Sequence, residues 1–514
     1  MSLDVVTPTW ADLAEGLARA HSGALTATVR GSQVDVTSRL PKLLKTLREC
    51  RAQMGRGARV RGTARSSGME WFLDNYYLIE QALGQVKQDL PVRFYRQLPF
   101  IGDAGRAGPP RAYVLAEAIL AADDFQFDPG QLFDFMDAYQ TLSPLTLGEI
   151  WVLPSMLRIA LLEAVTTAVT QLAEAPDADE AADAAARAVA DETVATVVVS
   201  LRALDRMDWK PAAERLSLLH RVLADGDPAG VYLAMDYDTR NRYRRAVEEI
   251  ARRCPLAEIE VARTAVALAS GCPADQLRRR HVGFYLVDAG RPTLEESVSC
   301  RLSLGERVLR TVLDHPTAAY LLPILFVTAT LVAAAGGYAG RLAPWAVVPA
   351  LLLALVPALT AAVDLTNWAF ARVLPPRVLP KVDHSEGIPA DFRTLVVVPG
   401  LASGPADIDA LLTNVRAHYL RNPDPALAFA VLSDFPDADG PDRPEDAAVL
   451  DHAEAALAEL NAATPGAPFL LLHRRRLRNA AEGTWMGWER KRGKLHELNR
   501  LLRGATDTSF VLVA

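Results

Sequence analysis

The sequence is poor in cysteine, and it lacks several short motifs that identify common enzyme families. Four of its 514 residues are cysteine (Cys50, Cys254, Cys272 and Cys300), and none belongs to a CxxC pair or to a Cys/His spacing suited to zinc. They are therefore expected to be reduced, structural thiols. No GxxxxGKS/T or GxGxxG motif is present, so a P-loop ATPase or a Rossmann dehydrogenase is not supported; HExxH and GxSxG are also absent.

The sequence also lacks an excess of positive charge. Its 55 Lys and Arg residues face 62 Asp and Glu residues, which gives a net charge of −7. This balance argues against a general nucleic-acid binder, so nucleic acid is not expected among the partners. Charged residues make up 23% of the chain, which excludes a disordered or low-complexity protein.

Two long uncharged runs decide the class of protein. Residues 316–340 carry no charged side chain, and after Arg341 neither do residues 342–363. Each run exceeds the ~20 residues that cross a hydrocarbon core of ~30 Å, so the pattern predicts a two-helix transmembrane hairpin. The alternative is a buried helical hairpin inside a large soluble domain.

The basic residues beside these runs predict their orientation. Arg301, Arg307 and Arg310 precede the first run, whereas Arg372, Arg377 and Lys381 follow the second, and only Arg341 lies between them. Basic residues favour the cytoplasmic side. We therefore expect a multi-pass protein of a bacterial-type cytoplasmic (inner) membrane, with both large flanks cytosolic and the lipid bilayer as a partner.

The segment before the hairpin has a helical pattern. Residues 154–173 are apolar but contain Arg158 and Glu163, which favours a buried amphipathic helix over a third span. Residues 175–192 are rich in alanine and acid, as in an exposed helix or hinge. Residues 205–250 combine Tyr232, Tyr237 and Tyr243 with several arginines. That combination fits a solvated helix face with Arg stacked on Tyr, or a surface that handles sugar.

The predicted secondary structure changes to alternating strands and helices after the Pro-rich stretch 373–381. Strands are predicted at 393–400, 428–434 and 469–473, with helices at 408–419, 447–462 and 488–503, and an apolar run closes the chain at 510–514. Alternating strands and helices with apolar strands predict a parallel sheet covered on both faces. Ligands bind at the carboxyl ends of such strands, here Pro399–Gly400, Ser433–Asp434 and His473–Arg474.

Positive charge gathers in the same region. Residues 471–504 hold ten Lys or Arg and three Glu, a local charge of +7. A diphosphate needs such compensation, and the turn Arg490-Lys491-Arg492-Gly493-Lys494 offers both cations and a glycine. The alternatives are a basic patch on the membrane surface and a solvated helix face.

Several long motifs resemble one enzyme family. They are EWFLDNYYLIE (70–80), DLPVRFYRQLP (89–99), YQTLSPLTLGEIWVLPSMLR (139–158), DPAGVYLAMDYDTRNRYRRAVEE (227–249), HVGFYLVDAGRP (281–292), LVVVPG (395–400), LSDFPDA (432–438) and GTWMGWERKRGKLHELNRLLRGATDTSF (483–510). In this order they resemble the cyclic β-1,2-glucan synthases, whose transferase module is glycosyltransferase family 84. The resemblance is weakest in 175–192 and in the first ~30 residues.

The resemblance implies a membrane enzyme with a GT-A-like fold that transfers glucose from UDP-glucose to a growing β-1,2-glucan acceptor. It implies a donor pocket formed by Pro399, Gly400, Asp434, Lys491 and Lys494. Asp434 would contact the uracil or ribose, and Lys491 with its neighbours would hold the diphosphate. For Asp434 an Asx-turn or a helix cap stays open. Trp485 and Trp488 would either stack on sugar or pack in the core.

The catalytic residues stay unknown at this stage. Inversion at the anomeric carbon needs a carboxylate base, and usually a divalent metal (Mg²⁺ or Mn²⁺) held by an Asp-x-Asp turn. Neither follows the KRGKL helix, so we expect no metal ligand in this chain, and we expect the chain to be an inactive amino-terminal part of a longer synthase. The alternative is a membrane-anchored scaffold or interaction protein with a degenerate sugar-nucleotide fold.

These expectations define four segments. Residues 1–313 form a mostly α-helical cytosolic domain, and 314–365 a transmembrane hairpin. Residues 366–384 form a Pro-rich linker, and 385–514 an incomplete α/β sheet of the GT-A-like glycosyltransferase type.

Overall fold

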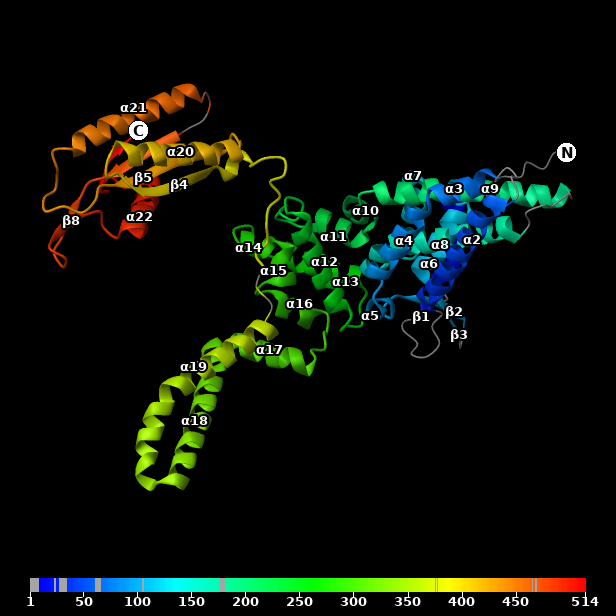
Figure 1. Ribbon diagram of the computed structural model, residues 1–514, viewed down its shortest axis with the longest axis horizontal. Coiled ribbons are helices and arrows are strands. Elements are labelled where there is room, and N and C mark those ends of the chain that lie inside the picture. The colour runs from blue at the N-terminus through cyan, green and yellow to red at the C-terminus, as the bar shows by residue number, and fades with distance from the viewer. Residues whose placement is uncertain are drawn as a thin grey trace. The chain divides into compact units, whose positions relative to one another are not determined.

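The computed structural model describes residues 9–22, 25–26, 35–60, 66–103, 106–174, 181–374, 376, 378–464, 466 and 469–514. Contacts within the chain divide it into two compact units, Met1–Lys381 and Val382–Ala514. The first unit is almost entirely helical, whereas the second contains a four-stranded sheet (Figure 1). All four cysteines are free thiols.

Helices dominate the first unit. They are α1 (Trp10–Ser22), α2 (Leu40–Val60), α3 (Ser67–Asp74), α4 (Tyr76–Asp89), α5 (Val92–Tyr95), α6 (Arg111–Ala121), α7 (Pro129–Leu142), α8 (Leu147–Glu174), α9 (Ala181–Arg206), α10 (Trp209–Leu216), α11 (Leu218–Gly226), α12 (Tyr237–Ala251), α13 (Glu258–Ser270), α14 (Leu277–Arg280), α15 (Val282–Val287), α16 (Arg291–Ser297), α17 (Leu304–Asp314), α18 (Pro316–Leu342) and α19 (Val347–Val373). A small antiparallel sheet joins β1 (Leu25–Thr26), β2 (Phe100–Asp103) and β3 (Arg106–Pro110).

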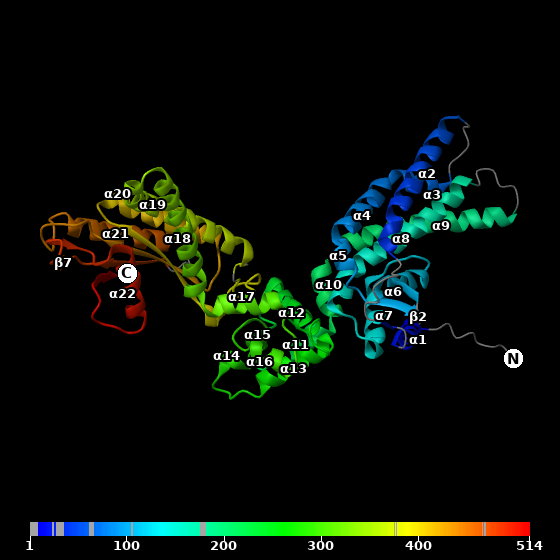
Figure 2. The same cartoon turned by 90° about the horizontal axis from the view of Figure 1, so that it is seen from below.

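The long helix α8 is the centre of the first helical core. Helices α2, α4, α6 and α9 pack around it (Figure 2), and 78% of its most apolar window is buried. This fits the buried helix predicted from residues 154–173. The helix is longer than that segment, because it begins at Leu147 and continues through Pro154. Residues 175–180 of the predicted acidic segment lie outside the described residues.

A second helical core follows between residues 219 and 298. It is formed by α11, α12, α13, α15 and α16, with Tyr232 and Tyr243 fully buried inside it. The interpretation of 205–250 as a solvated face is therefore wrong for these tyrosines. Arg244 is also buried, and Glu214 neutralises its charge at a distance of 2.7 Å. Its guanidinium lies over the ring of Tyr237, which agrees with the stacking of Arg on Tyr predicted from the sequence.

Helices α18 and α19 lie side by side as an apolar hairpin (Figure 1). Both are long and apolar enough to cross a membrane, and only 11% of each apolar window is buried by the rest of the chain. The alternative of a hairpin buried inside a soluble domain does not fit this exposure.

The boundary of the predicted linker needs correction. Helix α19 runs to Val373, so residues 366–373 of the predicted linker are helical. The helix ends where it does because a residue before proline, here Leu374, is disfavoured in the helical conformation. Arg377, one of the basic residues used for the orientation, lies outside the described residues.

The second unit contains the predicted strands and helices within a few residues. Strands β4 (Thr394–Leu401), β5 (Leu427–Asp434) and β6 (Phe469–Arg474) run parallel, as predicted, and β9 (Phe510–Val513) pairs antiparallel with β6. The helices are α20 (Pro405–Arg421), α21 (Asp446–Ala463) and α22 (Arg490–Leu502). The sequence did not predict the short hairpin β7 (Leu477–Asn479) and β8 (Thr484–Met486).

Apolar side chains cover both faces of this sheet, as its continuous apolar strands predict. On one face α20 and α21 pack against Phe429, Val431 and Leu471. On the other, Leu498 of α22 packs against Ala430, Leu432 and Leu472. The strand order β4-β5-β6-β9 by itself does not establish a GT-A fold.

Candidate site at the carboxyl edge of the sheet

The candidate site lies where the three parallel strands end. The pairing register places Leu401 opposite Asp434, and Asp434 opposite Arg474. Gly400, Ser433 and His473 form the preceding row. The first turns of α22 reach the same edge, so residues that are far apart in the sequence meet there.

Asp434 is the centre of a buried ion-pair network. Its Oδ1 accepts from Arg474 Nε at 2.8 Å, and its Oδ2 accepts from Arg474 Nη2 at 3.0 Å. Lys494 Nζ lies 3.1 Å from the same Oδ2, and the Asp434 side chain is only 2% exposed. The Asx-turn and helix-cap interpretations therefore do not describe this carboxylate. It balances two buried cations instead.

Lys494 links α22 to two of the three parallel strands. Its ammonium contacts Asp434 on β5 and donates a hydrogen bond to the Gly400 carbonyl on β4. Burial lowers the pKa of Lys494, and the Asp434 charge opposes that shift. An ammonium has three donors, so one remains after these two contacts. Lys494 thus fixes α22 against the strand ends.

Arg474 holds the other half of the network. Its Nη1 donates to Glu497 at 3.0 Å, and its Nη2 donates to the carbonyls of Trp488 and Arg490 at 3.1 and 3.3 Å. Glu497 in turn accepts from the backbone N–H and the hydroxyl of Ser509. The sequence placed Arg474 at a strand end, but its role was not predicted.

The turn before α22 is tight and its backbone is strained. Glu489 and Arg490 adopt φ values of 48° and 35°, a left-handed conformation that ordinary side chains rarely take. Gly493 is required there, because a Cβ would lie 1.9 Å from the Trp488 carbonyl oxygen. A Cβ at Gly487 would come within 2.6 Å of Asp434 Oδ2. These contacts give a physical reason for the glycines of GWERKRGK.

Lys491 differs from Lys494 in its surroundings. It is exposed, and within the described residues it makes no hydrogen bond or ion pair. Its neighbour Arg490 pairs with Asp437 at 3.0 Å. Lys491 is thus an available cation on a turn that buried ion pairs hold in place.

A cleft of about 640 Å³ opens beside this edge. Arg443, Arg475 and Arg476 give it positive charge, and Trp485 and Phe435 give it aromatic surface. Asp446 neutralises Arg476 at its wall. None of Pro399, Gly400, Asp434, Lys491 and Lys494 lines the cleft. Trp485 is half-buried beside it, whereas Trp488 is 44% exposed.

His473 makes the stability of the edge depend on pH. It is fully buried, its Nδ1 lies 2.8 Å from Ser433 Oγ, and burial lowers its pKa to about 4. An unfolded histidine titrates at ~6.5, so the unfolded chain takes up a proton first as the pH falls. The second unit should therefore lose about 2 kcal/mol of stability between pH 7 and pH 5.

Hydrogen exchange of β5 and β6 in the full chain measures this loss. The substitution His473→Asn keeps a polar atom near Ser433, but asparagine does not titrate. The hydrogen-exchange protection of β5 and β6 in this variant should therefore change less over the same pH range. An equal pH dependence in both proteins would assign the effect to other groups.

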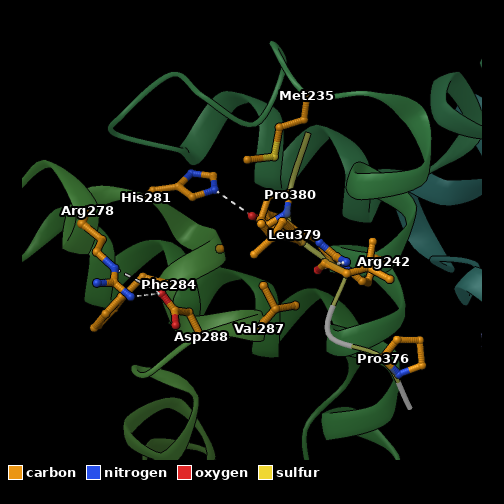
Figure 3. A pocket seen from close by; sticks show the side chains of 13 residues that line it. Met235, Arg242, Arg278, His281, Phe284, Val287, Asp288, Pro376, Leu379 and Pro380 are labelled. Atoms are coloured by element: carbon orange, nitrogen blue, oxygen red, sulfur yellow. Dashed lines mark hydrogen bonds and ion pairs between the residues drawn. The ribbon is translucent and has the colours of Figure 1, made fainter. Parts of the chain in front are cut away.

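The first unit contains a separate cavity of about 540 Å³. Arg242 and Leu379 lie on one side of it, and Arg278, His281 and Phe284 on the other (Figure 3). His281 connects Asp227, at 3.0 Å, with the hydroxyl of Tyr243, at 3.1 Å. Burial raises the pKa of Tyr243 to about 12, so this phenol stays neutral near pH 7.

The segment after α19 closes one wall of this cavity. The Lys381 carbonyl accepts from Asp236 N at 3.0 Å, and Lys381 N donates to Thr239 Oγ1 at 3.1 Å. Arg242 donates to the Val378 carbonyl. The end of the first unit is therefore fixed to the start of α12.

The described residues contain no group of three or more His, Cys, Asp or Glu side chains placed to hold a metal ion. Asp437, in the loop FPDADG, faces Arg490 rather than a second carboxylate.

The comparisons with known proteins agree with the motifs. No protein-family model matches the chain. The chain is 32% identical over 551 aligned residues to the protein named Cyclic beta-(1,2)-glucan synthase NdvB of Rhizobium meliloti (strain 1021). The similarity covers 91% of this chain but only 19% of that protein. The chain thus spans about a fifth of the length of the relative it matches.

Proposed function

We propose that this chain, which is related to the cyclic β-1,2-glucan synthases, supplies the membrane hairpin and part of the glucosyltransferase site of such an enzyme. The reaction is the transfer of glucose from UDP-glucose to a growing β-1,2-glucan. The observation that carries the proposal is the similarity along 91% of the chain.

The geometry of the edge supports a nucleotide-sugar donor. Parallel sheets bind ligands beyond the carboxyl ends of their strands. Here this edge presents the exposed Lys491 at the start of α22, where backbone N–H groups also favour an anion. We assign the binding of the diphosphate to Lys491. Lys494 instead holds Asp434 and Gly400 in position. Pro399 and Gly400 supply the adjoining strand end.

The chemistry of the whole enzyme goes beyond this chain. Inversion at the anomeric carbon needs a carboxylate base, and a divalent cation (Mg²⁺ or Mn²⁺) would stabilise the leaving diphosphate. The described residues offer no group of three or more His, Cys, Asp or Glu side chains for such a metal, and Asp434, Asp446 and Asp437 are each neutralised by arginine.

We also propose that α18 and α19 cross a bacterial cytoplasmic membrane. Their length, apolar composition and uncovered surface support this placement. The basic residues at both outer ends favour two cytosolic flanks. Protease accessibility in inverted vesicles tests the orientation, and protection of both large flanks would contradict it.

Replacing Lys491 tests the donor assignment. Lys491→Ala should weaken UDP-glucose binding by about 1.5–3 kcal/mol, because it removes charge-assisted contacts to the diphosphate. Isothermal titration of the detergent-purified chain measures the affinity.

Arg503→Ala is the matched control for this substitution. Arg503 is also exposed and follows the last turn of α22, so its removal changes the net charge equally. The affinity of the Arg503→Ala variant for UDP-glucose should stay near that of the unmodified chain. Equal losses in both variants would indicate a diffuse electrostatic effect, and unchanged affinity in Lys491→Ala would remove the assignment.

A further inference from the structure

Helix α17 has an apolar face that the described chain leaves uncovered. None of its described side chains is buried, and Leu304, Val308 and Leu313 are 79%, 63% and 58% exposed. Leu309 and Val312 lie on the same side of the helix but are half-buried, whereas Glu306, Arg307, Arg310 and Asp314 occupy the opposite side. Such a division of side chains is typical of a helix that lies at an apolar–polar boundary.

Ion pairs turn the polar face of α17 toward the second helical core. Glu306 pairs with Arg253, and Arg310 pairs with Glu295 of α16. The Arg301 backbone N–H also donates to the Arg253 carbonyl at 3.0 Å. These contacts fix the rotation of the helix and leave Leu304, Val308 and Leu313 exposed.

The start of α17 is capped by its own residues. Ser303 and Glu306 build a capping box, in which Ser303 N donates to Glu306 Oε2 at 3.0 Å and Glu306 N donates to Ser303 Oγ at 3.4 Å. An already ordered helix loses little conformational entropy when its apolar face is covered.

The position of α17 identifies what covers that face. Only His315 separates it from α18, and the two helices are in contact (Figure 1). The apolar face therefore continues into the uncovered surface of the hairpin. We propose that α17 lies in the headgroup–acyl boundary of the phospholipid bilayer and seats the second helical core on the membrane surface. This inference rests on the proposed membrane crossing of α18 and α19.

Site-specific fluorescence in lipid vesicles tests the proposal. Single cysteines at Leu304, Val308 and Leu313 are labelled with the polarity-sensitive dye NBD in a chain whose native cysteines are replaced by alanine. Arg307 and Asp314 provide matched positions on the polar face. The labelled chains are reconstituted in phosphatidylcholine–phosphatidylglycerol vesicles, with or without a lipid that carries a doxyl quencher near the headgroup.

The three apolar positions should show blue-shifted emission and strong quenching by the shallow doxyl lipid, and the two polar positions should show neither. Blue-shifted emission without lipid quenching would mean that protein covers the face, which overturns the proposal, as would water-like emission at all five positions. Phe326→Cys in α18 reports separately, through a deep doxyl lipid, on the membrane crossing itself.

The unmodified chain supplies an independent readout in case the cysteine-free background does not fold. A photoactivatable diazirine phosphatidylcholine in the vesicles should crosslink to the peptide that contains residues 304–313. Crosslinks confined to α18 and α19 would contradict an interfacial α17.

Discussion

The purified 514-residue chain, reconstituted in liposomes with UDP-[¹⁴C]glucose and Mg²⁺ or Mn²⁺, should incorporate no detectable glucose into glucan. The physical reason is that arginine holds the buried carboxylates at the edge of the sheet. Asp434 and Glu497 both pair with Arg474, and Asp446 pairs with Arg476. A general base must offer an available oxygen to the acceptor hydroxyl, and its loss typically costs about 10²–10⁴-fold in rate.

The protein of Rhizobium meliloti named as a cyclic β-1,2-glucan synthase provides the positive control under identical conditions. UDP-glucose binding by the 514-residue chain, measured in parallel, shows that the sample is folded. Robust metal-dependent incorporation by the chain would contradict the assignment of its carboxylates. Asp437 and Asp439, in the loop after β5, would then be the first residues to replace.

Removing Arg474 should have the largest effect on stability. Arg474→Ala leaves Asp434 and Glu497 in a buried site without their shared cation, although Lys494 still contacts Asp434. Breaking a buried ion pair on one side costs about 3–5 kcal/mol. Hydrogen exchange of β5 and β6 in the full chain should show the corresponding loss of protection, while α8 in the first unit stays protected.

Arg475→Ala is the matched control, since the adjacent arginine is exposed on the same strand end. It should leave protection of the sheet close to that of the unmodified chain. Equal protection in Arg474→Ala and Arg475→Ala would show that the network around Asp434 does not stabilise the second unit.

Much of the second unit is predictable from local sequence pattern. The runs LVVV, AFAVL and FLLL are short, continuously apolar and separated by amphipathic helices, so their length and spacing indicate parallel strands. The antiparallel pairing of β9 and the hairpin β7–β8 were not predicted. The direction in which β9 pairs depends on how the chain returns to the sheet after α22, which a local apolar pattern does not specify, and β7 and β8 have only three residues each.

The sequence predicts that residues at the strand ends lie near one another, but it does not predict the contacts between them. Gly400, Asp434 and Lys494 do meet at one edge, because strand ends and the start of α22 converge there. Sequence alone gives Lys491 and Lys494 the same chemical character. Only the fold separates them, since one side of α22 faces the strands and buries Lys494 while Lys491 stays outside. The sequence likewise does not distinguish Arg474 from the other Lys and Arg residues of 471–504, whereas its buried contacts in the fold do.

The central claim is that UDP-glucose binds at the carboxyl edge of β4, β5 and β6. Hydrogen exchange of the full chain in saturating UDP-glucose tests it most directly. The account predicts slower exchange in the loop after β4, around residues 400–404, and at the start of α22, around 489–494, with no change in α8. Unchanged exchange at both segments, with the ligand bound, would contradict it.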